Sequence, residues 1–524
     1  MTDTPRRPGD YDGDDYDAFD DADESDETVD PGALPAVFGA AGDDLSDFPT
    51  LGDDDERDRD DRDDDKPLDE SSPEDAAAAQ RVWEELLARV GEQAPQPRLG
   101  ATRRAVELLG DPQRSYPVIH ITGTNGKTST SRMIESILRA YGLRTGLMTS
   151  PHLVKVNERI VIDGRPISDA ALAANWADIQ PYLLMVDTEL TAAAEQPLTY
   201  FEALTVLAFA SFADAPVDVV VLEVGMGGEW DSTNVADGQV AVFTPIALDH
   251  TKRLGSTVAA IAKTKSGIIK PAAAVVSAKQ TPEALAELVR AAELTESTFA
   301  LEGPRDERGA FEVLKSDVAV GGQVISVRGI AGRYDDLALP LFGRHQAENA
   351  AVAIAAVESF LGNGSQPLDP EILSAGLSAA TSPGRLQILA NDPTILVDAA
   401  HNPHGARSLA DALGEYFSFD RVVAVLAVLD DKDAAGIIRN LAPAVEHFVV
   451  TQSDSERAID ADSLAAVAVG IVGPDRVTVE PNIVSALGIA RDLADEAESG
   501  GVVVTGSITL VGDVIALTEE DGWK

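Results

Sequence analysis

The chain has 524 residues and contains no cysteine, which excludes disulfide bonds, thiolate metal sites and cysteine nucleophiles. It has neither a signal-peptide pattern nor an uninterrupted apolar run of about 18 residues, so we expect a cytoplasmic protein that makes no membrane contact. Its net charge of −48 argues against a nucleic-acid partner, which would require a basic face.

Acidic residues are concentrated near the N-terminus. Residues 1–75 carry 30 Asp and Glu against 6 Lys and Arg, which accounts for −24 of the net charge. Such runs, with almost no apolar pattern, are typical of solvated disordered segments. We therefore predict an acidic disordered tail over residues 1–72, with partner binding by the tail as the less favoured alternative. Residues 74–90 then have the apolar spacing of an amphipathic helix.

A glycine-rich turn, Gly123-Thr-Asn-Gly-Lys-Thr128, joins a predicted strand at residues 118–122 to a predicted helix. Backbone N–H groups of such a turn can surround a phosphate at the helix N-terminus. Lys127 would neutralise the β- and γ-phosphates, and the Thr128 hydroxyl would reach Mg²⁺. The pattern is a shortened phosphate-binding loop, because Ile121 stands where the first glycine is usual. Its setting between strand and helix favours nucleotide binding over a purely structural turn.

Strands and helices alternate along the rest of the chain. Continuous apolar runs, such as residues 217–222, suit parallel strands that are covered on both faces. The other predicted strands are residues 144–148, 240–244, 274–277, 395–398, 422–426, 448–451 and 502–505. A turn-rich break at residues 381–384 separates two alternating series. We predict an α/β fold: a doubly wound P-loop ATPase-like domain, residues 73–383, followed by a smaller Rossmann-like α/β domain, residues 384–524.

Three candidate site residues follow predicted strands of the first domain. Glu223 ends the most apolar strand, and a buried carboxylate there needs a cation or a hydrogen-bond donor, so it is a candidate Mg²⁺ ligand; a partnered core carboxylate is the alternative. Ser150 could ligate a hard cation, although a Ser-Pro pair also begins ordinary turns. His250 could be a metal ligand or an acid/base group, or a structural histidine. Lys263 and Lys265 lie on a helix whose ordinary interpretation is a solvated face.

The second domain begins with two further candidates. Asp398 ends an apolar strand, as Glu223 does, and leads into the turn His401-Asn-Pro-His-Gly405. Arg385 lies at the predicted domain boundary, where a guanidinium could bridge phosphates across a cleft. An exposed arginine at the surface is the alternative interpretation.

Taken together, nine ordered motifs from about residue 75 to the end resemble the folylpolyglutamate synthase/dihydrofolate synthase family, a branch of the Mur ligase superfamily. The motifs span residues 123–128, 150–153, 199–202, 223–228, 248–251, 265–268, 383–385, 401–405 and 506–512. The resemblance implies an ATP- and Mg²⁺-dependent amide ligase that adds L-glutamate to folates through an acyl-phosphate intermediate. Its acceptor would be a reduced folate, dihydropteroate, or both, and the enzyme would act as a monomer.

The resemblance also assigns roles to individual residues. ATP would contact Gly123, Thr124, Asn125, Gly126, Lys127, Thr128, Asn349, Arg385 and Asp398. The implied magnesium ligands are Ser150, Glu223 and His250, and the implied catalytic residues are Lys127, His250 and Lys265, the last carboxylated by CO₂. The pteroate-binding segments would be Thr199, Tyr200, Phe201 and Glu202, and Trp230, Asp231 and Ser232.

Two alternatives share parts of this pattern. A Mur-type cell-wall peptide ligase uses the same chemistry but carries a uridine-nucleotide domain of about a hundred residues before its phosphate loop. About 45 residues separate Pro73 from the first predicted strand, which is too few. A P-loop NTPase switch that ligates nothing would have no use for the His401–Gly405 turn.

Overall fold

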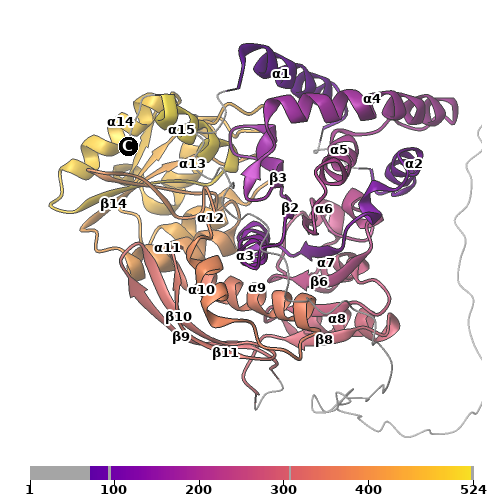
Figure 1. Ribbon diagram of the computed structural model, residues 1–524. Helices are drawn as coiled ribbons and strands as arrows, with labels where there is room; N and C mark the ends of the chain where they lie inside the picture. Colours follow the sequence, from indigo (N-terminus) through magenta and orange to yellow (C-terminus); the bar gives the residue numbers. More distant parts are fainter. Residues whose placement is uncertain (1–70, 92–95, 306–308, 521–524) are drawn as a thin grey trace, which may run out of the picture. The chain divides into compact units, whose positions relative to one another are not determined.

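The computed structural model describes residues 71–91, 96–305 and 309–520 (Figure 1). For residues 519 and 520 it describes the backbone alone. The predicted acidic tail therefore lies outside the described residues, except for Ser71 and Ser72. The described elements belong to one compact unit, Asp69–Lys524. Within the described ranges, no helix combines the length and the apolar character needed to cross a membrane.

The first sheet has eight strands in the order β4-β3-β2-β5-β1-β6-β7-β8. All neighbours from β2 to β8 pair in parallel, whereas β3 pairs antiparallel with β2 and with β4. The strands are β1 Val118–Thr122, β2 Thr145–Met148, β3 Ile160–Ile162, β4 Arg165–Pro166, β5 Val219–Glu223, β6 Gly238–Phe243, β7 Ala274–Ser277 and β8 Thr298–Leu301. The carboxyl ends of β5, β1 and β6 consequently meet at one edge, where ligands bind in sheets of this kind.

Helices cover both faces of this sheet. On one face α3 and α9 pack over Val219 and Val221, and on the other α1, α2, α4 and α5 pack over Val220 and Leu222. The continuous apolar run of β5 is thus explained by burial on two sides. The helices of this part are α1 Pro73–Leu87, α2 Gly100–Leu108, α3 Lys127–Ala140, α4 Asp169–Ala192, α5 Tyr200–Asp214, α6 Thr251–Leu254, α7 Val258–Lys265, α8 Pro282–Leu294, α9 Arg344–Gly362 and α10 Pro370–Ser378. Short 3-10 turns are η1 Pro112–Arg114, η2 Val156–Arg159, η3 Ser232–Val235 and η4 Ser266–Ile268.

A separate antiparallel sheet of three strands, in the order β11-β10-β9, packs beside α9 and α10 (Figure 1). Its strands are β9 Glu312–Ala319, β10 Gly322–Arg328 and β11 Arg333–Leu339. Alternate residues such as Ile325, Val327 and Leu337 join the same hydrophobic core as α3 and α9. The strand prediction from the sequence had missed this sheet.

The second large sheet has six strands in the order β12-β13-β17-β14-β15-β16, all parallel except the first. Its strands are β12 Gln387–Asn391, β13 Thr394–Asp398, β14 Arg421–Leu426, β15 His447–Val450, β16 Val477–Val479 and β17 Gly500–Thr505. The helices α11 Pro403–Tyr416, α12 Ala434–Leu441 and α13 Ala461–Val472 cover one face, and α14 Ile483–Asp495 and α15 Ile508–Glu520 the other; η6 spans Pro474–Arg476. The last strand in sequence lies between β13 and β14.

The predicted fold class is confirmed: two α/β layered sheets follow one another along the chain. The predicted strands at residues 118–122 and 274–277 have the same bounds in the structure, and the helix predicted at residues 74–90 ends earlier, at Leu87. The predicted division between residues 383 and 384 falls in the connection from α10 to β12, and it stays a prediction.

Candidate active site

The glycine-rich turn after β1 passes close to its neighbours. A Cβ on Gly123 would lie 1.8 Å from Thr244 Oγ1, and a Cβ on Gly126 would lie 2.5 Å from Asn349 Oδ1. Gly126, at φ +88°, is also in a backbone conformation that favours glycine. The Thr124 hydroxyl donates to the carbonyl of Ala247 at 3.1 Å, which ties the turn to the segment after β6. Neighbouring residues therefore leave no room for a side chain at Gly123 or at Gly126.

Helix α3 begins at Lys127, directly after the turn, and its second residue contacts Glu223. Thr128 Oγ1 lies 3.0 and 3.1 Å from the two carboxylate oxygens of Glu223. Glu223 is only 1% exposed, and burial raises the pKa of its carboxyl, while the charge of Lys127 and the Thr128 hydroxyl oppose that rise. A buried carboxylate and a hydroxyl thus stand together at the first turn of the helix.

Lys265 is buried at the end of α7, whereas Lys263 is exposed, as expected of a solvated helix face. Its Nζ donates to the carbonyl of Gly123 at 2.7 Å. Burial, together with the charge of Lys127, lowers the pKa of the Lys265 ammonium to about 7. A large fraction of this amine is therefore neutral at neutral pH.

Asp249 connects His250 to the second part of the chain. One oxygen of Asp249 lies 3.0 Å from Lys432 Nζ, and the other lies 3.8 Å from Nε2 of both His250 and His401. Burial opposes ionisation of Asp249, but the contact with His401 and the positive charge of Lys432 lower the pKa of this carboxyl. Burial lowers the pKa of His250 to about 4, with the charge of Asp249 opposing the shift. His250 is therefore a neutral imidazole at pH 7. Asp249 and Lys432 were not among the predicted site residues.

The glycine-rich turn also contacts residues 401–405 directly. They were predicted as a turn, but residues 403–405 form the first turn of α11, and Asn402 is its N-cap. Asn402 Nδ2 donates to Asn125 Oδ1 at 2.9 Å, and Asn125 Nδ2 lies 3.1 Å from His404 Nδ1. Asn402 in addition caps α11 by accepting from the backbone N–H of Gly405. The side chain of Asn402 thus both fixes the Asn125 amide of the glycine-rich turn and stabilises helix α11 beside the second large sheet.

The remaining predicted nucleotide residues lie around these groups. Asn349 is buried on α9 against Gly126. Asp398, at the end of β13, accepts backbone N–H groups from Leu386 at 2.8 Å and from Ala400 at 2.9 Å, and burial raises the pKa of its carboxyl. Arg385 lines a small cavity together with Thr128. Asp398 therefore stabilises the turn that carries Arg385.

The predicted pteroate segment before α5 forms a helix cap. Thr199 and Glu202 bond to each other's backbone N–H groups, and the Glu202 carboxylate also forms an ion pair with Arg98 at 2.9 Å. The Tyr200 ring packs edge-on against Trp83 with ring centroids 6.0 Å apart. Phe201 packs closely on Gly225, where an added Cβ would lie 2.5 Å from the ring. This segment supports the loop after β5.

In the other predicted pteroate segment, Trp230 packs against a small core around α7, and Asp231 and Ser232 are buried. Asp231 accepts the backbone N–H of Met226 at 2.8 Å and the Thr233 hydroxyl at 2.5 Å. Thr233 Oγ1 in turn lies 2.9 Å from Nε2 of His120, which is fully buried. The carboxylate of Asp231 therefore holds the two ends of segment 226–233 together by hydrogen bonds.

The predicted magnesium trio is only partly connected by the contacts seen. Glu223 meets Thr128 and His250 meets Asp249, but among the described residues no hydrogen bond joins Ser150 to Glu223 or to His250. No group of three or more His, Cys, Asp or Glu side chains in the described ranges is arranged to hold a metal ion. Such groups do not include serine, and one of the three predicted ligands is Ser150. The magnesium trio therefore stays a prediction.

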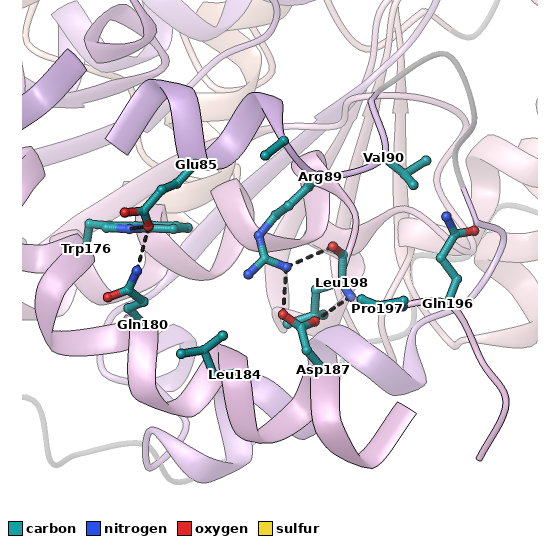
Figure 2. A pocket seen from close by; sticks show the side chains of 11 residues that line it. Glu85, Arg89, Val90, Trp176, Gln180, Leu184, Asp187, Gln196, Pro197 and Leu198 are labelled. Carbon is teal, nitrogen blue, oxygen red and sulfur yellow. Dashed lines mark hydrogen bonds and ion pairs between the residues drawn. The ribbon is translucent and has the colours of Figure 1, made fainter. Parts of the chain in front are cut away.

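A larger cavity, of about 360 Å³, lies between α1, α4 and residues 196–198 (Figure 2). None of the predicted site residues lines it. Its polar groups bond to one another: Arg89 forms an ion pair with Asp187 at 3.0 Å and donates to the carbonyl of Leu198, and Trp176 donates to Glu85. Its arginine is paired and its Glu85 carboxylate already accepts two hydrogen bonds, so we assign no function to it.

Comparisons with known proteins agree with this geometry. The sequence matches the Mur ligase middle domain over residues 121–357 and the Mur ligase, glutamate ligase domain over residues 384–508. The dihydrofolate synthase/folylpolyglutamate synthase of Mycobacterium tuberculosis is 44% identical over 471 residues, which covers 86% of this chain and 96% of that protein. The folylpolyglutamate synthase of Lacticaseibacillus casei is 40% identical over 354 residues, covering 66% of this chain and 81% of that protein.

Solved structures extend the likeness to three dimensions. The Mycobacterium tuberculosis folylpolyglutamate synthase complexed with ADP has a TM-score of 0.80 and 43% identity, covering 84% of this chain and 98% of that one. The E. coli FolC in complex with DHPP and ADP has a TM-score of 0.72 and 29% identity, covering 84% and 98%.

The fold and the site together define a ligase of the Mur type, which forms a C–N bond with ATP as its energy source. The chain belongs to the folylpolyglutamate synthase/dihydrofolate synthase family. The resemblance inferred from the nine motifs is thereby confirmed.

Proposed function

We propose that this enzyme joins the amino group of L-glutamate to a carboxylate of a folate or dihydropteroate, with ATP as the phosphoryl donor. The observation that carries the proposal is the meeting of the phosphate-type turn, Glu223 and Lys265 with residues 401–405. Relatives that share both domains are named for this reaction, and some bind ADP in their solved structures.

In the first step an oxygen of the acceptor carboxylate attacks the γ-phosphorus of ATP, and ADP leaves. Activation of this kind is needed because a carboxylate does not react with an amine until its oxygen becomes a good leaving group. The backbone of residues 123–126 would hold the phosphates, and Lys127 would neutralise the negative charge on the transferred group. Asn349, Arg385 and Asp398 would hold the nucleotide from the other side of the site.

In the second step the amine of glutamate attacks the acyl carbon, phosphate leaves, and the attacking nitrogen loses a proton. The proton goes to the departing phosphate or to water. His250 is neutral because burial lowers its pKa, and a neutral imidazole has a lone pair with which it can bind the predicted metal ion. Asp249 would orient the rings of His250 and His401, since both lie 3.8 Å from the same carboxylate oxygen.

Mg²⁺ fits the donor set near the turn. The Glu223 carboxylate and the Thr128 hydroxyl are hard oxygen ligands, and the buried carboxylate has no cation bonded to it within the described residues. Glu223, with Ser150 and His250 as predicted partners, would hold the ion. When bound, it would supply positive charge beside the phosphates.

Replacing Glu223 with glutamine is expected to raise the Mg²⁺ concentration for half-maximal activity at least about tenfold, because the amide keeps the shape and loses the charge. The measurement is a Mg²⁺ titration of ADP release at saturating ATP. Glu229→Gln, on the exposed residue of the following loop, is the matched control. An unchanged titration of the Glu223 variant would remove this residue from the metal site.

We further propose that Lys265 is carboxylated by CO₂, which replaces one N–H bond by an N–C bond and releases a proton. The reaction requires a neutral amine, and the pKa of about 7 supplies one. Its position against the Gly123 carbonyl would put the new carboxylate beside the phosphate turn.

For the acceptor, we propose that residues 199–202 and 230–232 border the pteroate. Phe201 and Trp230 offer aromatic surface for a flat pteridine ring. Asp231, Glu202 and Thr199 would shape the segments rather than touch the ring, because their side chains already bond within the protein.

The test is incubation with ATP, Mg²⁺ and labelled L-glutamate, offering dihydropteroate and tetrahydrofolate in turn. We expect label in the folate product and ADP release that depends on both acceptor and glutamate. ADP release that proceeds equally without them would favour a nucleotide switch, and use of a cell-wall peptide precursor instead would favour a peptide ligase. Sedimentation of the same sample checks the predicted monomer.

A further inference from the structure

Arg132 lies on α3 one turn after Thr128, and no role has been given to it above. Residues four apart on a helix share a face, and their side chains tilt towards the helix N-terminus, here the phosphate-type turn. Thr128, Arg132 and Arg385 line the same small cavity, of about 20 Å³, with Glu158 at its wall. Arg132 is therefore directed towards the predicted nucleotide site.

The guanidinium of Arg132 is not satisfied by the protein around it. Its Nε is buried and has no hydrogen-bond partner in the part of the chain that the structure describes. The neighbouring carboxylates are bonded elsewhere: Glu158 accepts the backbone N–H groups of residues 153–155, and Glu223 accepts the Thr128 hydroxyl. A partly buried guanidinium with an unpaired, buried Nε is unusual, because arginine stays charged and its donors are normally paired.

The charges around the small cavity also favour binding of an anion. Burial lowers the pKa of Arg132, the charges of Glu135, Glu158 and Glu223 oppose the shift, and the like charge of Arg385 adds to it. Two guanidinium groups and one carboxylate, Glu158, line the cavity, so positive charge is in excess among its lining residues. The larger cavity of Figure 2 differs in this respect, since its arginine, Arg89, is paired with Asp187 and Leu198.

We propose that Arg132, together with Arg385, binds an oxyanion of a substrate. The proposal rests on the proposed ligase function and adds a residue to its substrate site. A guanidinium suits a phosphoryl group or a carboxylate, because its planar donors can bond two oxygens at once. A cavity this small holds about one water-sized group, so one oxygen of the oxyanion enters it and the rest of the substrate stays outside. That oxygen belongs to the γ-phosphoryl group of ATP or to a carboxylate of glutamate.

The two sources are separated by one variant, Arg132→Gln, and three measurements. Calorimetry with Mg²⁺ gives the affinities for ADP and for AMPPCP, an unreactive ATP analogue, and the glutamate KM comes from ADP release. If the group is γ-phosphoryl, AMPPCP affinity falls roughly ten- to a hundredfold while ADP affinity stays unchanged. If it is a carboxylate, both affinities stay unchanged and the glutamate KM rises by a similar factor. The proposal is overturned if all three values match wild type, or if ADP and AMPPCP weaken equally.

Arg139→Gln is the matched control, because Arg139 is on the same helix, partly exposed, and paired with Glu135 at 3.1 Å. It should leave all three values unchanged. Since Arg132 has no partner of its own at Nε, Arg132→Gln should unfold at or above the wild-type temperature. A variant that fails to fold would show a structural guanidinium and would also overturn the proposal.

Failure of the proposed function gives a different result. The nucleotide arm needs no turnover, so a wild-type protein that binds AMPPCP but adds no glutamate refutes the ligase proposal alone. In that case calorimetry with glutamate replaces the KM. Selective loss of AMPPCP affinity or of glutamate affinity in Arg132→Gln still supports an oxyanion site, and loss of neither overturns it. Arg132→Lys, which keeps the charge but not the planar donors, should recover only part of the affinity.

Discussion

Replacing Lys127 with alanine is expected to abolish ADP release, lowering kcat by at least about a thousandfold, while the fold stays intact. Lys127 is the first residue of α3, and its Nζ makes one bond of 3.3 Å, to the carbonyl of Thr124. Little native structure depends on that bond, and alanine favours the helix. The lost charge, in contrast, would leave the transferred phosphoryl group without its neutralising partner.

Glutamate-dependent ADP release measures the effect, and thermal unfolding checks the fold. Lys155→Ala is the control, because Lys155 is an exposed lysine in the loop after β2. The control should keep wild-type turnover. Wild-type kcat in the Lys127 variant would exclude the glycine-rich turn from the mechanism.

The second large effect is expected at Lys265. Lys265→Arg keeps the positive charge but cannot form the carbamate, and we expect its activity to fall on the order of a hundredfold or more. Lys263→Arg, on the exposed lysine of the same helix, should behave as wild type. The contrast between two lysines two positions apart separates a chemical role from a general effect of charge.

Wild-type activity should also depend on CO₂ and pH. The amine is neutral above its pKa of about 7 and protonated below it, so carboxylation is favoured as pH rises through 7 and is lost as pH falls. Degassing at pH 6 should lower activity, and bicarbonate at pH 8 should restore it; Lys265→Arg should respond to neither treatment. Electron density for an unmodified Lys265 in active crystals would contradict the proposal.

The parallel strands could be read from the sequence because both of their faces are buried. Val219, Val220 and Val221 alternate between two helical layers, so the whole run must be apolar. The antiparallel strands β9 to β11 have one face in the core and the other exposed, and Lys315, Asp317 and similar residues dilute their apolar signal. No prediction was made for helix α4; Pro181 lies inside its 24 residues, and an internal proline weakens the helical pattern.

Site residues divide in a similar way. Glu223 and Asp398 were recognisable because an acid at the end of an apolar strand is costly without a partner. Asp249 and Lys432 meet each other from far apart in the sequence, and a charge in a loop carries no mark of its partner. Arg132 could have been noticed from its spacing of four residues after Thr128, but the absence of a partner is visible only in three dimensions.

The position of β17 also has a consequence for biosynthesis. β13 and β14 each pair with this strand, which comes last in the sheet's chain order. During translation their edges stay open until residue 505 has left the ribosome, long after the first sheet can close. Open apolar edges invite wrong pairing, so the nascent chain is most vulnerable to aggregation in this interval, and chaperone demand should be concentrated there.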